Sequence, residues 1–208
     1  MKMSEGLGRT FAIFALTLIF SIPLGMIVAW LRMSKNRIIS NVTRFVISIL
    51  RGTPLMLQLL AVTYGPYYLF EISVSRNKLI PVVVAFAINY AAYFCEIFRA
   101  GIESIPKGQY EAADVLGLTK SQTFFRIILP QVTKRVIPAT ANEVIVLVKD
   151  TSLANVIAFA EITMKAKQQM NFYSSIMPLF IAGIFYFVMN TLVTMLFSYI
   201  EKKFDYYK

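Results

Sequence analysis

The sequence predicts an all-α, polytopic membrane protein with about five transmembrane helices and one long cytoplasmic loop. Hydrophobic residues make up 57% of the 208 residues and charged residues 15%, whereas soluble domains average about 45–50% and about 25%. Several stretches without charge approach the roughly 20 residues that a helix needs to cross a bilayer. Lys and Arg also divide unevenly between the two sets of loops. We therefore predict a single transmembrane domain over residues 1–208.

The first two predicted spans lie in the N-terminal third of the chain. Residues 10–31 carry no charge and lack a small-residue cleavage site, so this first span is expected to be retained. Residues 52–70 form the second uncharged stretch. The preceding residues 41–51 are apolar but contain Arg44 and end at Arg51, and we interpret them as an interfacial helix that leads into the second span.

The three later spans differ sharply in polarity. Residues 79–98 and the last two-thirds of residues 168–200 are almost or entirely free of charge. Residues 136–159 have a suitable length but contain three charged residues: Glu143, Lys149 and Asp150. Charges inside a spanning helix are expensive and normally face a bundle interior or a water-filled path. This fourth span is therefore the best candidate for lining a translocation route.

Orientation follows from the distribution of Lys and Arg. Thirteen of them fall in loops and tails on one side of the predicted spans and six on the other. The positive-inside rule places the richer side in the cytoplasm. The N-terminus is then outside, the C-terminus is cytoplasmic, and a loop at about residues 99–135 is cytoplasmic. The net charge of +10 needs no nucleic-acid partner to explain it.

Composition also limits the chemistry. There is no histidine and a single cysteine, Cys95, so neither a metal-ligand cluster nor an internal disulfide is expected. No G-x-x-x-x-G-K-[ST] stretch is present to cradle a nucleotide phosphate. We expect no catalytic residue, no metal and no cofactor in this chain.

The cytoplasmic loop contains "EAADVLGLTKSQTFFRIILP", residues 111–130. Glu111 falls in the first turn of a predicted helix 109–116, where it complements the helix dipole. Gly117 is placed to end that helix. Thr119 and Gln122 have capping-box spacing for a second helix that we expect to end at Pro130. Such a knob suits a groove on another protein; a plain loop helix without a partner is the alternative.

The same stretch resembles the cytoplasmic loop of ATP-binding-cassette importer permeases. Their pattern is E-A-A, three residues, G, nine residues, I, one residue, L-P, and it is filled here by Glu111, Ala112, Ala113, Gly117, Ile127, Leu129 and Pro130. "RGTPLMLQL" (51–59), "EIFRAGIESIPKGQ" (96–109) and "LVKDTSLANVI" (147–157) resemble the polar amino acid branch, which includes histidine, glutamine, arginine and cystine permeases. The likeness runs from about residue 10 to residue 204.

The resemblance implies a translocation subunit in a prokaryotic cytoplasmic membrane. Its coupling helix would dock on a separate ATPase through Glu111, Ala112, Ala113, Asp114, Gly117, Ile127, Leu129 and Pro130. The implied partners are a second copy or a related permease, two cytoplasmic ATPase subunits that bind ATP and Mg, and an extracytoplasmic amino-acid-binding protein. That protein would dock near residues 71–78 and 161–173, on the outer face.

The fourth span supplies the main candidates for cargo contact. Glu143 and Asp150 are seven residues apart and share a helix face. Asn142 and Lys149 repeat that spacing on the neighbouring stripe. Glu143 suits the ammonium of an amino acid and Lys149 its carboxylate. Structural or gating roles are the alternative for all four.

Polar residues elsewhere leave two interpretations open. Asn89 and Tyr93 share one face of the third span, either as interhelical hydrogen-bonding groups or as pore lining. Thr151 and Ser152 form either an unwound turn or hydrogen bonds to carbonyls one turn back. A break before the second span is expected as a simple kink or as a gate or dimer contact; it comprises Arg51, Gly52, Thr53 and Pro54.

Two further function classes compete with the importer. An ion-driven secondary carrier or channel would commonly show internal repeats, and none is visible here. A membrane enzyme is disfavoured by the missing histidine and metal ligands. The sequence does not decide which amino acid is carried, or whether the permease pairs with a copy of itself.

Overall fold

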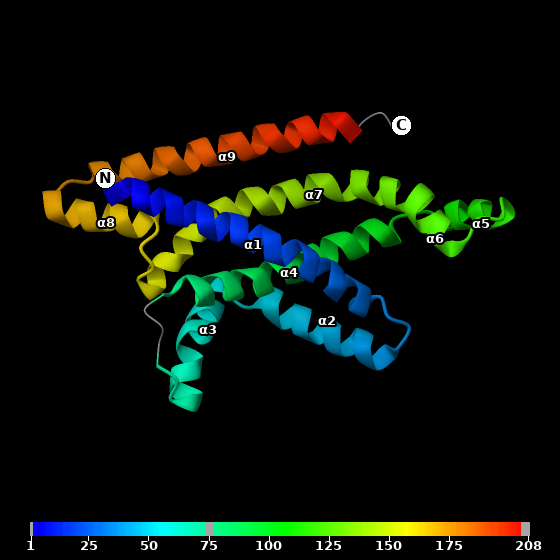
Figure 1. The fold of residues 1–208 in the computed structure, drawn as a ribbon, viewed down its shortest axis with the longest axis horizontal. Helices are drawn as coiled ribbons and strands as arrows, with labels where there is room; N and C mark the ends of the chain where they lie inside the picture. Colours follow the sequence, from blue (N-terminus) through cyan, green and yellow to red (C-terminus); the bar gives the residue numbers. More distant parts are fainter. Residues whose placement is uncertain (1, 74–76, 205–208) are drawn as a thin grey trace.

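The computed structural model describes residues 2–73 and 77–204, and each element in these ranges is helical (Figure 1). The predicted all-α class is confirmed. The elements in chain order are α1 (Lys2–Arg32), α2 (Arg37–Gly52), α3 (Leu55–Phe70), α4 (Leu79–Glu103), α5 (Lys107–Val115), α6 (Lys120–Gln122), the π-helix η1 (Thr123–Ile128), α7 (Leu129–Asp150), the 3₁₀-helix η2 (Thr151–Ile157), α8 (Ile162–Tyr173) and α9 (Met177–Phe204).

The pair α1 and α4 forms the centre of the bundle. These helices pack along each other more extensively than any other pair, and Ile13 and Phe86 lie fully buried in the core that they share. A Cβ atom at Gly25 would approach the Cβ atom of Phe94 to 2.7 Å, closer than such atoms come in real proteins. The missing side chain at Gly25 is therefore what lets the two helices pack this closely.

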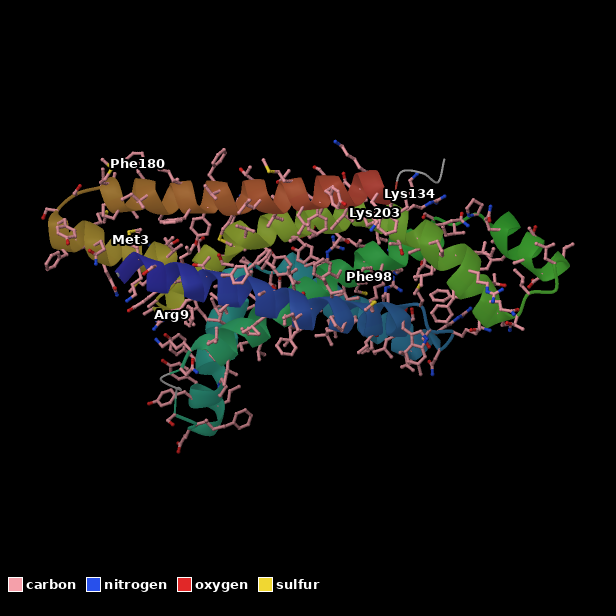
Figure 2. The ribbon with its side chains drawn as sticks, turned by 45° about the horizontal axis from the view of Figure 1, so that its top comes forward. Met3, Arg9, Phe98, Lys134, Phe180 and Lys203 are labelled. Carbon is pink, nitrogen blue, oxygen red and sulfur yellow. The ribbon has the colours of Figure 1, made fainter. Side chains whose placement is uncertain are left out.

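The remaining long helices surround this pair. α7 and α9 lie side by side, and α8 packs against the start of α1 at the opposite end of the bundle from α5 and α6 (Figure 1). α9 is apolar and exposes most of its surface. Figure 2 shows Phe180, which is 62% exposed, and Lys203 at opposite ends of this helix. Such an apolar outer face suits lipid or another membrane subunit.

The predicted count of about five spans is borne out approximately. Among the described residues, α1, α4 and α9 are long and apolar enough to cross a membrane, and the bent pair of α2 and α3 makes up to four. α7 does not qualify on hydropathy. It is nevertheless the helix predicted as the polar fourth span, and it packs between α4 and α9.

The residues interpreted as an interfacial helix, 41–51, belong to α2, and the second predicted span, 52–70, continues as α3. α2 packs on α1 and α4, and α3 leaves it at an angle of 105°. Thr53, between the helices, is extended (φ −115°, ψ 145°), as is usual before a proline because the ring of Pro54 crowds the helical conformation. The chain therefore breaks at the residues where a kink was expected.

The fourth predicted span also differs from a continuous helix over residues 136–159. α7 ends at Asp150, and the backbone tightens into η2 before Ala158 takes a left-handed conformation with φ 56°. Lys78 donates from Nζ to the carbonyl of Ile157 at 2.6 Å. This bond satisfies a carbonyl at the end of η2 that the helix leaves without an internal partner.

Candidate functional site

The loop between α4 and α7 begins with α5, which matches the helix predicted at residues 109–116. Gly117 has φ 71°, a left-handed conformation that glycine adopts without the steric cost of a Cβ. Its N–H donates to the carbonyl of Asp114 at 3.0 Å, and the N–H of Leu118 donates to that of Ala113 at 3.1 Å. Gly117 thus terminates α5 as predicted.

The second part of the loop begins with the predicted capping box. The N–H of Gln122 donates to Thr119 Oγ1 at 3.3 Å, and the N–H of Thr119 donates to Gln122 Oε1 at 2.9 Å. The predicted end at Pro130 is wrong, because α6 continues through η1 into α7. In η1 the N–H of Leu129 bonds to the carbonyl of Phe124, five residues back. This wider turn leaves room for a proline ring that would otherwise clash one turn earlier.

The loop presents an apolar tip beside carboxylates. Val115 is 88% exposed and Leu116 75% exposed. Glu111 and Asp114 are exposed on the same short helix, whereas Ala113 is buried. The loop is anchored by a buried cluster of Ile105, Ile128 and Val132. A rigid knob with an exposed apolar end can be inserted into a groove of another protein.

A cavity of about 520 Å³ lies between α2, α4 and α7. Its charged and aromatic lining comprises Arg51, Tyr93, Glu96, Arg99, Arg135 and Glu143. The Arg51 guanidinium lies 5.0 Å from the centre of the Tyr93 ring, within the range of a cation–π interaction. A larger hollow of about 690 Å³ between α8 and α9 has no charged lining. Two further hollows, beside the end of α9 and beside η1, also have charged linings. The 520 Å³ cavity is distinguished from them because it contains Tyr93 and Glu143, both predicted for the substrate path.

The two acidic residues of α7 lie differently from the two residues on the neighbouring stripe. Asp150 accepts a hydrogen bond from the Tyr90 hydroxyl at 2.8 Å, and both Asp150 and Glu143 are partly buried. Asn142 and Lys149 are exposed. Within this chain, the positive charges that line the same cavity as Glu143 are those of Arg51, Arg99 and Arg135, and Lys149 is not among them.

Asn89 is 4% exposed and bridges helices rather than lining the cavity. Its Nδ2 donates to the carbonyl of Leu50 at 3.1 Å and to Gln58 Oε1 at 3.0 Å. Gln58 Nε2 in turn donates to the carbonyl of Leu50 at 2.8 Å and to Thr53 Oγ1 at 2.8 Å. These amides satisfy backbone groups that the break before Pro54 leaves open.

The start of η2 and the charged end of α4 can also be described from their contacts. Thr151 is buried and donates to the carbonyl of Val148 at 2.7 Å, as the carbonyl-bonding interpretation expects for this residue. Thr151 and Ser152 begin the tighter 3₁₀-helix η2 rather than an unwound turn. On α4, Glu96 and Arg99 form a local ion pair at 2.6 Å. Arg99 also pairs with Glu103 at 2.5 Å.

Sequence reasoning missed Gln58 and Glu161. Glu161 is fully buried and caps α8 through hydrogen bonds from the N–H groups of Thr163 at 2.6 Å and Met164 at 2.7 Å. It also accepts from the Tyr186 hydroxyl at 3.0 Å. Burial raises the pKa of the Glu161 carboxyl above its ordinary value, and the hydrogen bonds oppose that rise. The sequence signal that could have predicted this cap is a single acidic residue directly before a helix.

The family model for the inner membrane component of binding-protein-dependent transport systems matches residues 21–206. The chain belongs to this family. It is 38% identical over 208 residues to the L-cystine transport system permease protein TcyB of Bacillus subtilis (strain 168), covering 99% of this chain and 87% of TcyB. It is 36% identical over 200 residues to the arginine transport system permease protein ArtQ of the same organism, covering 96% and 90%.

A solved structure described as an amino acid ABC transporter with histidines superposes with a TM-score of 0.88. The two chains are 34% identical, with 97% of this chain and 93% of the other covered. The permease is thus a multi-pass protein of the cytoplasmic membrane and a translocation subunit of an ATP-driven importer. The comparisons therefore favour the ATP-driven importer over the alternative of an ion-driven carrier or channel. Its relatives are permease subunits, so ATP hydrolysis belongs to a separate subunit.

Proposed function

We propose that this permease moves polar amino acids into the cytosol. The observation that carries the proposal is the single cavity that contains both Arg51 and Glu143. An amino acid zwitterion needs an anion for its ammonium and a cation for its carboxylate. Relatives named for cystine, arginine and glutamine transport support the same class of cargo.

Within the cavity, Glu143 would bind the cargo's ammonium and Arg51 its carboxylate, with the Tyr93 ring between them. Asp150, held by Tyr90, would extend the acidic face. Asn142 and Lys149 lie on the exposed stripe of α7. We assign them to the part of the route that the second permease subunit encloses.

The other polar residues would support this site without touching the cargo. Asn89 holds the break at residues 51–54, which sets the position of Arg51. Thr151 and Ser152 begin η2, where the polar face of α7 ends. The carboxylates of Glu111 and Asp114 and the apolar tip of the loop would enter a cleft on the ATPase. ATP and Mg would be bound there and not by this chain.

Coupling is tested at Gly117. A valine there has a β-branched side chain at a left-handed backbone position, and such strain costs about 1–3 kcal/mol. Gly117→Val should reduce uptake at least tenfold and weaken co-purification with the ATPase. Gly108→Ala is the matched control, because its Cβ would meet nothing within 4 Å and its φ is not positive. Normal uptake in Gly117→Val would remove the coupling role from this loop.

The assembly would pair this chain with a second copy or a related permease, two ATPase subunits and an extracytoplasmic binding protein. The binding protein would dock on residues 161–173 and on 71–78, of which 74–76 lie outside the described residues. Figure 1 supports the proposed orientation, since the end of α9 and the α5–α6 loop lie toward one end, and the start of α1 and α8 toward the other.

Thiol labelling tests that orientation. An impermeant reagent should reach a cysteine at Ser121 only from the cytosol and one at Ser73 only from outside. The cysteine at Cys95 is buried and should stay silent in both experiments. The opposite pattern would reverse the proposed topology.

The cargo site is tested by Glu143→Gln in proteoliposomes that contain the ATPase and the binding protein. The substitution keeps the shape and removes the charge. Uptake should fall at least tenfold, while assembly and basal ATP hydrolysis persist. Unchanged apparent affinity and rate for each amino acid carried would show that Glu143 does not contact the cargo.

A further inference from the structure

α2 has three faces of different chemistry along its length. One face packs on α1 and α4 through Ile47 and Leu50. The second is apolar and exposed, and it comprises Ile38, Ile39, Val42, Phe45, Val46 and Ile49. The third is polar and exposed, and it comprises Arg37, Asn41, Arg44, Ser48 and Arg51. We name this third face the arginine stripe. Its residues recur every three or four positions, so they form one continuous line on the helix.

The arginine stripe lies on a helix that packs beside two candidate membrane spans. α2 packs beside α1 and α4, which are both long and apolar enough to span. From Arg37 to Arg51 the stripe rises about 21 Å at 1.5 Å per residue, against a hydrocarbon core of about 30 Å. Neither Arg37 nor Arg44 has an ion-pair partner among the residues that the structure describes. Arginines at this depth are stable only beside water or other polar groups.

The inner end of the arginine stripe meets the candidate cargo cavity. Arg51, on α2, lines that cavity and lies over the ring of Tyr93, on α4. Glu143 lines the same cavity from α7. The other end, at Arg37, follows the short turn after α1, at the predicted cytoplasmic side. A polar line therefore connects the cavity with the cytosol.

We propose that the arginine stripe is one wall of a water-filled route from the cavity to the cytosol, and that its arginines attract the cargo's carboxylate during release. A channel lined by one sign of charge raises the local concentration of the opposite sign. The role in cargo release rests on the proposed amino acid transport. The hydration of the stripe does not, so the two can fail separately.

Hydration is tested by cysteine scanning of the complete transporter in inside-out vesicles, with Cys95→Ser as the background. Single cysteines replace Asn41, Arg44 and Ser48 on the stripe, or Val42, Phe45 and Ile49 on the apolar face as matched neighbours. A charged, impermeant thiosulfonate should label the stripe positions at least tenfold faster. Equal labelling of the two faces would overturn the proposal. The proposal would also be overturned if the stripe positions were labelled in vesicles of neutral lipid but not in vesicles of anionic lipid, because lipid headgroups would then occupy the stripe.

The field of the arginines is tested at the cysteine that replaces Ser48. An anionic thiosulfonate should react faster there than a cationic one, and adding Arg44→Gln should reduce this preference several-fold. Arg44→Lys should keep it. If the ratio of the anionic to the cationic labelling rate stays the same in Arg44→Gln, the stripe is hydrated but its arginines do not attract anions as proposed.

The cargo arm compares Arg44→Gln with Arg44→Lys in reconstituted uptake. The neutral variant should lower the maximal rate three- to tenfold with little change in apparent affinity, and the lysine variant should retain most of the rate. Equal uptake in both variants would overturn the guiding role even if labelling shows a hydrated stripe. Absence of amino acid uptake by the unmodified transporter would instead refute the proposed cargo.

Discussion

Two carboxylates in this permease, Glu161 and Glu143, differ in burial and in hydrogen bonding. Glu161 is fully buried, and its oxygens accept bonds from two backbone N–H groups and from Tyr186. Glu143 is only partly buried in a cavity, and no hydrogen bond or ion pair joins it to another of the described residues. Both carry the desolvation cost of an acid in or near a membrane. Only Glu161 offsets part of that cost through hydrogen bonds within the described residues.

The difference separates structural acids from functional ones. A buried charge with a complete set of internal partners holds elements together, here α8 and α9. A charge held in a cavity without such partners is available to a solute. Substitutions at the two positions should therefore separate stability from transport.

The largest effect on stability is expected for Glu161→Ala. It removes the cap of α8 and leaves the Tyr186 hydroxyl without its acceptor, a loss of about 3 kcal/mol. Thermal unfolding of the purified transporter measures it. Glu5→Ala, at the same end of the bundle, is the control, because Glu5 is 62% exposed and pairs with Lys165 only at 3.6 Å. Equal melting of both variants would contradict the structural role of Glu161.

A smaller loss is expected for Asn89→Leu, which extends the comparison to an uncharged polar group. The substitution leaves Gln58 Oε1 and the carbonyl of Leu50 each with one hydrogen bond fewer. Such bonds between membrane helices contribute about 0.6–1.7 kcal/mol. The exposed Asn142→Leu should cost less in the same unfolding assay. Similar losses at both positions would show that the amide pair does not stabilise the break.

A still smaller effect should appear in the pH dependence of stability. Because the pKa of Glu161 is raised in the folded state, the stability it contributes is complete below its ordinary pKa and is lost as pH rises through the folded value. The difference in melting temperature between the unmodified protein and Glu161→Gln should shift in favour of the unmodified protein as pH falls. A shift in the opposite direction would mean that the hydrogen bonds outweigh burial.

The smallest effect on stability is expected for Glu143→Gln. Removing a charge that has no internal bond should change the unfolding free energy by less than about 0.5 kcal/mol. Calorimetry of the purified transporter measures the change in stability, and the uptake assay on the same preparation measures the change in transport rate. A loss comparable with that of Glu161→Ala would place Glu143 among the structural acids.

The features predicted correctly from the sequence are those that depend on near neighbours in the chain. Gly117 ends α5, and Thr119 caps α6 through Gln122 three residues away. The break at Pro54 likewise follows from the ring of a single residue. The long apolar spans are also visible locally, because hydropathy is a property of each segment.

The features missed depend on distant contacts or on backbone register. The partner of Glu161 on α9 is 25 residues away, and the amide pair of Asn89 and Gln58 spans 31. Arg51 lines the cavity from the end of α2, together with residues of α4 and α7 that are more than 40 positions away, and no local pattern predicts that arrangement. Pro130 did not stop its helix, because the π-helical turn before it makes room for the ring.

The low hydropathy of α7 has a consequence for how the chain enters the bilayer during synthesis. A segment that does not qualify as a span by itself gains little from contact with lipid alone. α4 leaves the ribosome first and carries Tyr90, the partner of Asp150. α9 follows and covers another side of α7. We expect α7 to insert late, against α4, and to become fixed only when α9 has been made. Truncating the chain before α9 should therefore leave α7 exposed to protease, while α1 and α4 remain protected.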